Sequence, residues 1–96
     1  MRNANEQSLK EVIAEMLHRQ KLKGKLTEVR IRDCWEKVMG PTITNRTLDI
    51  QLKNRKLFIK INSAPLKHEL TYNLEKLVKL LNDEIGENVL DEIVLV

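Results

Sequence analysis

Aromatic residues and cysteine are scarce in this sequence, and long apolar runs are absent. Aromatic side chains make up 3% of the chain, as one Phe, one Tyr and one Trp. We therefore expect a core of Leu, Ile and Val, with few side chains available to stack on nucleic-acid bases. The single cysteine, Cys34, excludes an internal disulfide and a cysteine-rich zinc site. No apolar run approaches the roughly 20 residues that a membrane-spanning helix requires, so no membrane partner is expected.

The N-terminal residues lack the apolar stretch of a secretion signal. Together with the lone thiol, this composition predicts a cytoplasmic protein. A chain of 96 residues suffices for one domain. We therefore expect residues 1–96 to form a single domain, in which residues 1–7 are disordered.

The sequence contains no group of residues that predicts catalysis. Cys34 adjoins Trp35 on a predicted apolar helix face and is expected to be a packed thiol. His18 and His68 stand beside charged residues on separate helices and are expected at the surface. The glycines are isolated from one another, at Gly24, Gly40 and Gly86. Without a nucleophile–base pair, a ligand cluster or a glycine-rich phosphate loop, we expect no enzyme activity, cofactor, metal or small-molecule substrate.

Two helices are predicted in the first part of the chain. Ser8-Leu9-Lys10-Glu11 has the form of a capping box, and an apolar stripe with helical spacing begins there. The stripe consists of Leu9, Val12, Ile13, Met16 and Leu17. Gly24 is predicted to end this helix. A second helix is expected over residues 27–39, ended by Gly40-Pro41 and followed by a connector with one helical turn around Ile43.

After residue 47 the apolar residues recur at every second position instead of at helical spacing. Residues 48–53 and 56–61 alternate between apolar and mostly polar side chains on either side of Asn54-Arg55. This pattern predicts a β-hairpin with one apolar face and one largely charged face. Leu48, Ile50 and Leu52 are expected on the apolar face.

A long helix and a last strand complete the predicted fold. Ser63 is expected to be the N-cap, with Pro65 in the first turn and Gly86 at the end of the helix. Residues 89–96 are rich in β-branched side chains and predict a strand. The long connection allows a crossover that makes this strand parallel to the second. The expected fold is α+β, in the order α-α-β-β-α-β, with a three-stranded mixed sheet packed on helices.

Charge is unevenly distributed along the chain, although the net charge is only +3. Basic residues dominate residues 19–32 and 46–60, whereas residues 83–92 are acidic and no base follows Lys79. Two basic segments of this kind favour a polyanion or an acidic protein as the partner. A solvated surface of mixed charge is the alternative.

The hairpin carries the candidate nucleic-acid site. Phe58 lies between Lys56 and Lys60 on one strand face, where an aromatic ring can stack on a base while the ammonium groups contact phosphates. The full candidate set consists of Lys53, Arg55, Lys56, Phe58 and Lys60 in the hairpin and of Lys21, Lys23 and Lys25 before it. The alternative is that a helix or a second protomer covers Phe58 and that the lysines only protect an edge strand.

Several short motifs follow one another in a characteristic order over about residues 26–96. The first is Cys34-Trp35-Glu36-Lys37-Val38-Met39-Gly40-Pro41-Thr42-Ile43, which has the form W-x-x-V-v-G-x-x-I. The hairpin, Ser63-Ala64-Pro65-Leu66-Lys67-His68-Glu69-Leu70, and Leu81-Asn82 with Gly86 after it come next. In this order the motifs resemble the DciA family of bacterial replicative-helicase loaders. The resemblance implies a K-homology-like domain that contacts the replicative helicase and has affinity for DNA.

Two departures from related patterns narrow this expectation. Leu66 stands where the family often has an aromatic residue, and the chain has no Gly-x-x-Gly loop of the kind with which K-homology domains clamp a nucleic-acid backbone. We therefore predict a non-catalytic accessory protein of DNA replication that binds the replicative helicase and weakly contacts single-stranded DNA or RNA. A pure protein-interaction module and an RNA-associated factor are the alternatives.

Overall fold

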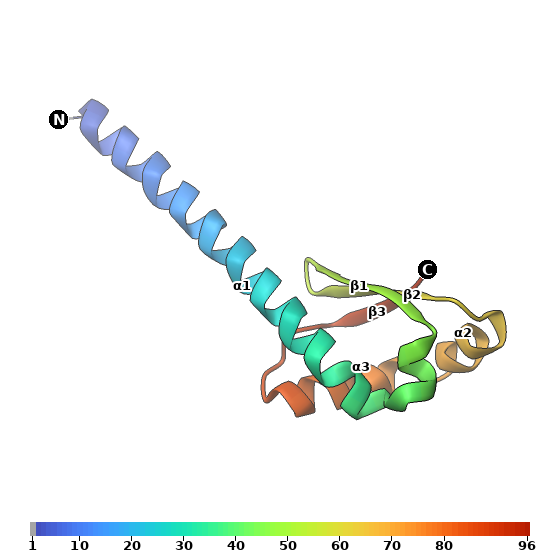
Figure 1. Ribbon diagram of the computed structural model, residues 1–96. Coiled ribbons are helices and arrows are strands. Elements are labelled where there is room, and N and C mark those ends of the chain that lie inside the picture. Colours follow the sequence, from blue (N-terminus) through green and yellow to red (C-terminus); the bar gives the residue numbers. More distant parts are fainter. Residues whose placement is uncertain (1) are drawn as a thin grey trace.

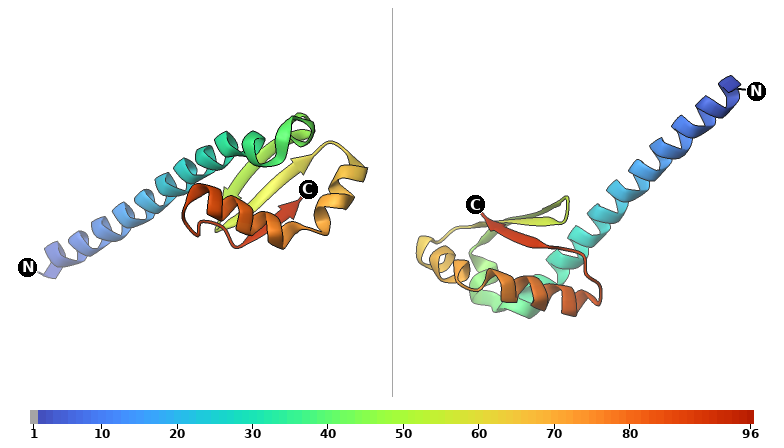
Figure 2. Two further views of the ribbon diagram at one scale, coloured as in Figure 1. Left: turned by 90° about the horizontal axis from the view of Figure 1, so that it is seen from below. Right: turned by 180° about the vertical axis from the view of Figure 1, so that it is seen from behind.

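The fold consists of a three-stranded sheet with helices packed on one of its faces. The computed structural model describes the backbone of residues 2–96 and the side chains of residues 8–96. Its elements are α1 (Arg2–Asn45), β1 (Thr47–Lys53), β2 (Lys56–Ile61), α2 (Ala64–Thr71), α3 (Leu74–Ile85) and β3 (Glu92–Leu95). The strands lie in the order β1-β2-β3. The last part of α1, α2 and α3 lie on the same side of the sheet, and the N-terminal part of α1 projects away from it (Figures 1 and 2).

The predicted fold class is confirmed. β1 and β2 pair antiparallel and β3 pairs parallel to β2, so the sheet is mixed. A kink at Gly40 divides α1 into two helical parts, which keeps the predicted order of two helices, two strands, a helical region and a strand. The prediction that one unbroken helix runs from Ser63 to Gly86 is wrong, because the chain turns at Tyr72 and Asn73 and divides this region into α2 and α3.

The predicted end of the first helix at Gly24 is wrong. α1 continues through this residue, and Thr27 Oγ1 donates a hydrogen bond of 2.9 Å to the carbonyl of Lys23 across it. A glycine inside a helix costs only about 1 kcal/mol relative to alanine, which the tertiary contacts of the following residues outweigh. The capping box is wrong too, because α1 begins at Arg2 and Ser8 lies inside it. Met1 and the side chains of residues 1–7 lie outside the described residues, so their predicted disorder stays a prediction.

The helix breaks at Gly40 instead. Gly40 has φ 83° and ψ 169°, a backbone conformation that essentially only glycine adopts. Pro41 follows and begins the short helical turn that was expected around Ile43. Thr44 Oγ1 donates to the carbonyl of Gly40 at 2.7 Å, so this carbonyl at the break finds a partner within the turn.

Trp35 links the end of α1 to the first strand. Its side chain is 2% exposed. The indole Nε1 donates to Thr47 Oγ1 at 3.0 Å, and Thr47 Oγ1 donates to the carbonyl of Ile43 at 2.8 Å. The only polar atom of this large apolar side chain is therefore satisfied inside the core.

The apolar face of the sheet differs from the prediction at one position. Ile50, Leu57, Ile59 and Ile61 are buried as expected, but Leu48 is 58% exposed. The register between β1 and β2 shifts between Thr47 and Asp49, and this bulge puts Thr47 rather than Leu48 next to Trp35.

The predicted helix ends in the second half of the chain are confirmed. Ser63 caps α2 and its side-chain oxygen accepts a bond of 3.3 Å from the N–H of Leu66. Gly86, with φ 86°, ends α3 and donates its N–H to the carbonyl of Asn82. The last strand is shorter than expected, because Val89 and Leu90 are buried in the loop before β3 rather than paired in it.

Gly24 and Gly40 form a matched pair for testing these backbone assignments. At both positions an added Cβ meets no atom within 4 Å, so the backbone conformation decides the effect. Gly24→Ala is expected to raise the free energy of unfolding by about 0.4–1 kcal/mol, since alanine favours the helix. Gly40→Ala is expected to lower it by about 1–3 kcal/mol, because φ there is positive. Urea unfolding of both variants measures the difference, and equal effects of both substitutions would contradict the assigned break.

Candidate nucleic-acid interface

The hairpin turn has the geometry of a tight two-residue connection. Asn54 and Arg55 both have positive φ, 50° and 65°, and Lys53 pairs with Lys56 on either side of them. Positive φ at both central residues is the signature of a type I′ turn, whose twist matches that of the strands. The turn therefore joins the end of β1 directly to the start of β2.

A groove between α1 and β1 brings three of the candidate lysines together. It has a volume of about 540 Å³, and α1 and the hairpin form its walls. Lys21 and Lys25 line it from α1, and Lys53 lines it from the end of β1. All three side chains are exposed. We call this feature the lysine groove.

Acidic and basic side chains pair with one another on the wall of the lysine groove next to these residues. Arg32 forms ion pairs with Glu28 at 3.3 Å and with Asp49 at 3.1 Å. Because Arg32 and Gln51 donate hydrogen bonds to Asp49, the pKa of that carboxyl is lowered. The lysines of the groove have no ion-pair partner among the residues whose side chains the structure describes, so they dominate its potential.

The same wall holds the hairpin on the helix. The Leu52 N–H donates to Glu28 Oε2 at 2.9 Å, and the Arg32 guanidinium donates to the carbonyl of Ile50. Leu52 and Ile50 lie on the free edge of β1, where no further strand pairs. Side chains of α1 thus satisfy this edge, which protects it against pairing with another chain.

A second groove lies on the other side of the turn, between α1 and the loop that precedes β3. Its volume is about 620 Å³, and Lys23 and Arg55 are among its lining residues. The Arg55 guanidinium is already bound there: Nε and Nη2 each lie 2.9 Å from a carboxylate oxygen of Asp91, and Nη2 lies 3.1 Å from Asn88 Oδ1. These bonds from Arg55 lower the pKa of Asp91. Arg55 therefore anchors the loop, and a phosphate would have to compete with Asp91 for it.

Phe58 lies on the face of the sheet opposite the helices. Gln51 of β1 and Val94 of β3 are its direct neighbours across the strands. The side chain is half-buried, and the helices pack on the other face in the part of the chain that the structure describes (Figure 2). Lys56 and Lys60 flank it along the strand and are exposed, but Lys56 lies 3.7 Å from Glu92. This face is less basic than the lysine groove.

The structure therefore divides the candidate residues between three places. Lys21, Lys25 and Lys53 share the lysine groove, Lys23 and Arg55 line the second groove, and Lys56, Phe58 and Lys60 lie on the open sheet face. Gln20 and Asn54 line both grooves and were not in the candidate set. No local pattern could have singled them out, because only the packing of α1 against the hairpin brings them together.

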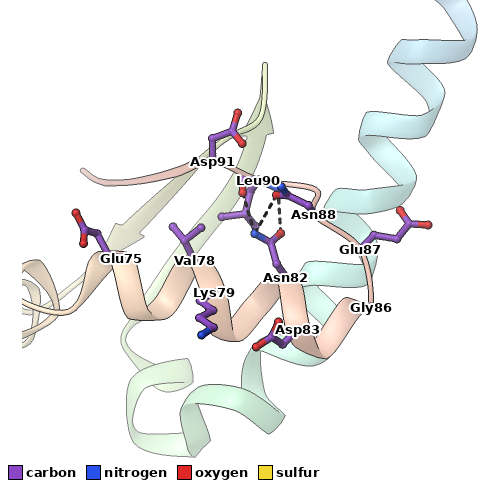
Figure 3. Close-up of a pocket in the computed structure, with 10 residues that line it drawn as sticks. All are labelled: Glu75, Val78, Lys79, Asn82, Asp83, Gly86, Glu87, Asn88, Leu90 and Asp91. Atoms are coloured by element: carbon purple, nitrogen blue, oxygen red, sulfur yellow. Dashed lines mark hydrogen bonds between the residues drawn. The ribbon is translucent and has the colours of Figure 1, made fainter.

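The side chain of Asn82 organises the loop before β3 (Figure 3). Its Oδ1 accepts the N–H groups of Val89 at 2.9 Å and Leu90 at 3.1 Å. Its Nδ2 donates to the carbonyl of Leu90 at 2.9 Å, and Figure 3 draws Asn82 beside Leu90. The pair Leu81-Asn82 is thus structural, with Leu81 fully buried and Asn82 bonded to the loop. Four acidic residues, Glu75, Asp83, Glu87 and Asp91, line the pocket beside Asn82.

The surroundings of the single cysteine, Cys34, do not favour its thiolate form. Burial and the nearby Glu84 carboxylate raise the pKa of the Cys34 thiol, and its Sγ donates to the carbonyl of Ile31 at 3.4 Å. A thiol with a raised pKa is a poor nucleophile. Groups of three or more His, Cys, Asp or Glu placed to hold a metal ion are absent from the described part. None of the helices described is long and apolar enough to cross a membrane.

A protein-family model matches most of the chain. The family model described as "Dna[CI] antecedent, DciA" matches residues 8–95. This range extends the similarity noted in the sequence motifs toward the N-terminus and includes most of the projecting part of α1. No curated protein and no solved structure matches the chain. The K-homology-like character of the fold therefore stays a prediction.

The ion pair between Arg55 and Asp91 predicts a loss of stability in acid. The Asp91 pKa lies below the ordinary value of about 3.9 in the folded protein, so its stabilising effect is present above that value and disappears as the pH falls through the lower folded pKa. Asp91→Asn is expected to lower the urea midpoint at about pH 7 and to reduce the difference between the midpoints at about pH 7 and about pH 3.

Glu87→Gln is the control for this comparison. Glu87 lies in the same loop and makes no ion pair among the described side chains, so its midpoints should follow those of the parent protein at both pH values. A parent-like acid response of Asp91→Asn would show that the pair does not stabilise the folded state.

Proposed function

Because the chain belongs to the DciA family, we propose that it is a non-catalytic accessory protein of DNA replication that binds the replicative helicase and contacts single-stranded nucleic acid through the lysine groove. Family membership supports the replication role and points to the helicase as the protein partner. The contact with nucleic acid rests on this chain's own residues. We place both activities in the cytoplasm.

The convergence of Lys21, Lys25 and Lys53 on one groove is the observation that carries the nucleic-acid part. Residues that are far apart in the sequence place three ammonium groups around one depression, with no acidic partner among the described side chains. Such a site binds phosphates by charge and releases counterions, which makes binding independent of sequence and sensitive to salt. Gln20 and Asn54 supply neutral hydrogen-bonding groups in the same groove.

The open sheet face supports a second, weaker contact. Phe58 offers a ring edge or face beside Lys60, and bases of a single strand that leaves the lysine groove along β1 and β2 can reach it. Its neighbours Glu92 and Asp49 reduce the positive potential there. The sheet face is therefore an auxiliary contact, and the lysine groove is the main one.

Neutralising the lysine groove tests the nucleic-acid contact. The triple variant Lys21→Gln, Lys25→Gln, Lys53→Gln is expected to weaken binding of a labelled single-stranded oligonucleotide about tenfold or more at low salt. The slope of log K against log salt should decrease by roughly 0.7 for each phosphate that the variant no longer neutralises. Fluorescence anisotropy at several salt concentrations measures both quantities.

A triple variant on α2 and α3 is the matched control. Lys67→Gln, Lys76→Gln, Lys79→Gln removes the same charge from residues outside the lysine groove and should bind the oligonucleotide almost as the parent protein does. Equally weakened binding by both triple variants would mean that net charge, and not the groove, attracts the nucleic acid. Failure of the parent protein to bind an oligonucleotide, with helicase binding retained, would leave a pure protein-interaction module.

Phe58 offers a separate test of the sheet face. Phe58→Ala is expected to weaken oligonucleotide binding by up to about 1–3 kcal/mol if one base stacks on the ring. Because stacking is not ionic, the salt dependence should stay that of the parent protein. Phe58→Tyr keeps the ring and should retain the affinity. Unchanged affinity of Phe58→Ala at all salt concentrations would exclude the sheet face from the contact.

A further inference from the structure

The N-terminal part of α1 carries an apolar stripe that nothing in the described structure covers. We call residues 8–26 of α1 the helical arm. Residues 8–23 are all exposed, and Thr27 is the first buried residue of the helix among those described. The stripe consists of Leu9 (61% exposed), Val12 (49%), Ile13 (49%), Met16 (47%) and Leu17 (61%). Figure 1 shows the arm projecting from the rest of the molecule. Contiguous exposed apolar side chains of this kind mark an interaction surface.

The stripe continues the core-facing side of the same helix. Thr27 and Ile31 follow Leu9 by 18 and 22 residues, which are close to whole numbers of helical turns. Both are buried, so the arm presents to solvent the side that the rest of α1 packs against the sheet and α3. At the base of the arm this side runs into the second groove, which Gln20, Lys23 and Thr27 help to line. A partner that lies along the stripe can therefore continue into this groove.

Basic residues border the stripe on both sides. Lys10 and Lys21 lie in one row with Leu17, at spacings of seven and four residues, and Arg19 and Lys23 lie in one row with Val12. Glu11 and Glu15 lie two residues before and after Ile13, which puts them on the reverse of the helix. Arg19 and Glu15 are 3.7 Å apart, but both side chains are highly exposed, so water screens the pair.

We infer that the helical arm is the helicase-binding element of this protein and that its stripe docks in an apolar groove with acidic rims on the replicative helicase. This inference rests on the proposed function and adds the surface and the chemistry of the contact. An apolar stripe with basic borders matches a groove of opposite charge, in the manner of an amphipathic helix bound in a partner. Leu17 of the stripe and Lys21 of its border also line the lysine groove, so the proposed helicase surface and the proposed nucleic-acid surface adjoin on α1.

The borders argue against a second copy of the chain as the occupant. If two arms paired through their stripes, the basic side chains that border one stripe would face those that border the other and repel them. These are Lys10, Arg19, Lys21 and Lys23. The acidic side chains of both arms would point away from the interface and could not compensate. A membrane surface is also disfavoured, because the stripe has no aromatic residue and the solvent side of the helix carries Glu11 and Glu15.

Two matched double variants test the docking of the arm on the purified replicative helicase of the same organism. Ile13→Lys with Met16→Lys puts two charges into the stripe and is expected to weaken helicase binding tenfold or more. His18→Lys with Leu22→Lys adds the same residues on the reverse of the arm, where both side chains are exposed, and should bind as the parent protein does. Calorimetry measures the affinities. Because the arm lies outside the core, both variants should unfold at the parent temperature and keep oligonucleotide binding.

Charge reversal at the border tests the acidic character of the partner. Lys10→Glu with Arg19→Glu is expected to weaken helicase binding and to lower its dependence on salt, whereas Glu11→Gln with Glu15→Gln should leave it unchanged or stronger. If the variant Lys10→Glu with Arg19→Glu bound the helicase as the parent protein does, the inference that the partner's groove has acidic rims would be wrong.

The remaining outcomes separate the two proposals. If the parent protein and the stripe variant bind the helicase equally, the inference about the arm is wrong and the proposed function stands. If the parent protein does not bind the helicase, both are wrong. A stripe variant that loses only self-association in sedimentation, or only binding to vesicles of phosphatidylcholine and phosphatidylglycerol, would overturn the helicase as occupant in favour of a second copy or a membrane.

Discussion

The buried Trp35 side chain fixes the direction of α1 relative to the sheet. Its indole N–H bonds to Thr47 at the start of β1, and Thr47 bonds back to Ile43 in the turn after the kink. This chain of hydrogen bonds ties the end of the helix to the first strand inside the core, where leaving any of the groups unpaired would be costly. The rest of α1 must then run alongside β1, with Glu28 at the free edge of the strand.

Both proposed binding surfaces follow from that direction. On the side of α1 that faces β1, the helix brings Lys21 and Lys25 opposite Lys53 and so forms the lysine groove. Further toward the N-terminus the same helix leaves the sheet behind, because β1 ends at Lys53, and its apolar side meets no partner among the described residues. The two proposed surfaces therefore lie on the same helix: Lys21 and Lys25 near the base of the arm line the proposed phosphate site, and the apolar stripe of the arm is the proposed protein-binding surface. The Lys37–Glu84 ion pair and the bond from Arg30 to the carbonyl of Ile85 hold the packed half on α3.

Local sequence signals predicted the parts of the fold that neighbouring residues decide. The hairpin, the Ser63 cap, the Gly86 stop and the parallel last strand follow from alternation, capping chemistry and connection length, and all are confirmed. Gly24 and Leu48 were misjudged for opposite reasons. At Gly24 tertiary packing of the following turns outweighs a small local cost, and at Leu48 a bulge reverses the side to which the residue points. The sequence alone identified the candidate nucleic-acid-binding residues, but it did not show that they lie on three separate surfaces.

By itself the sequence determined the α+β class, the basic character of the first half and the family to which the motifs point. It also led to the expectation that the chain has no catalytic cluster. Those properties depend on residue types and short spacings, which a single chain displays directly. Only the tertiary structure decided that the stripe from Leu9 to Leu17 is exposed, that Arg55 is held by Asp91, and that Lys21 and Lys53 share a groove. The reason is physical: a helical stripe has the same pattern whether it is covered or not, and the distance between two charges depends on how the chain folds between them.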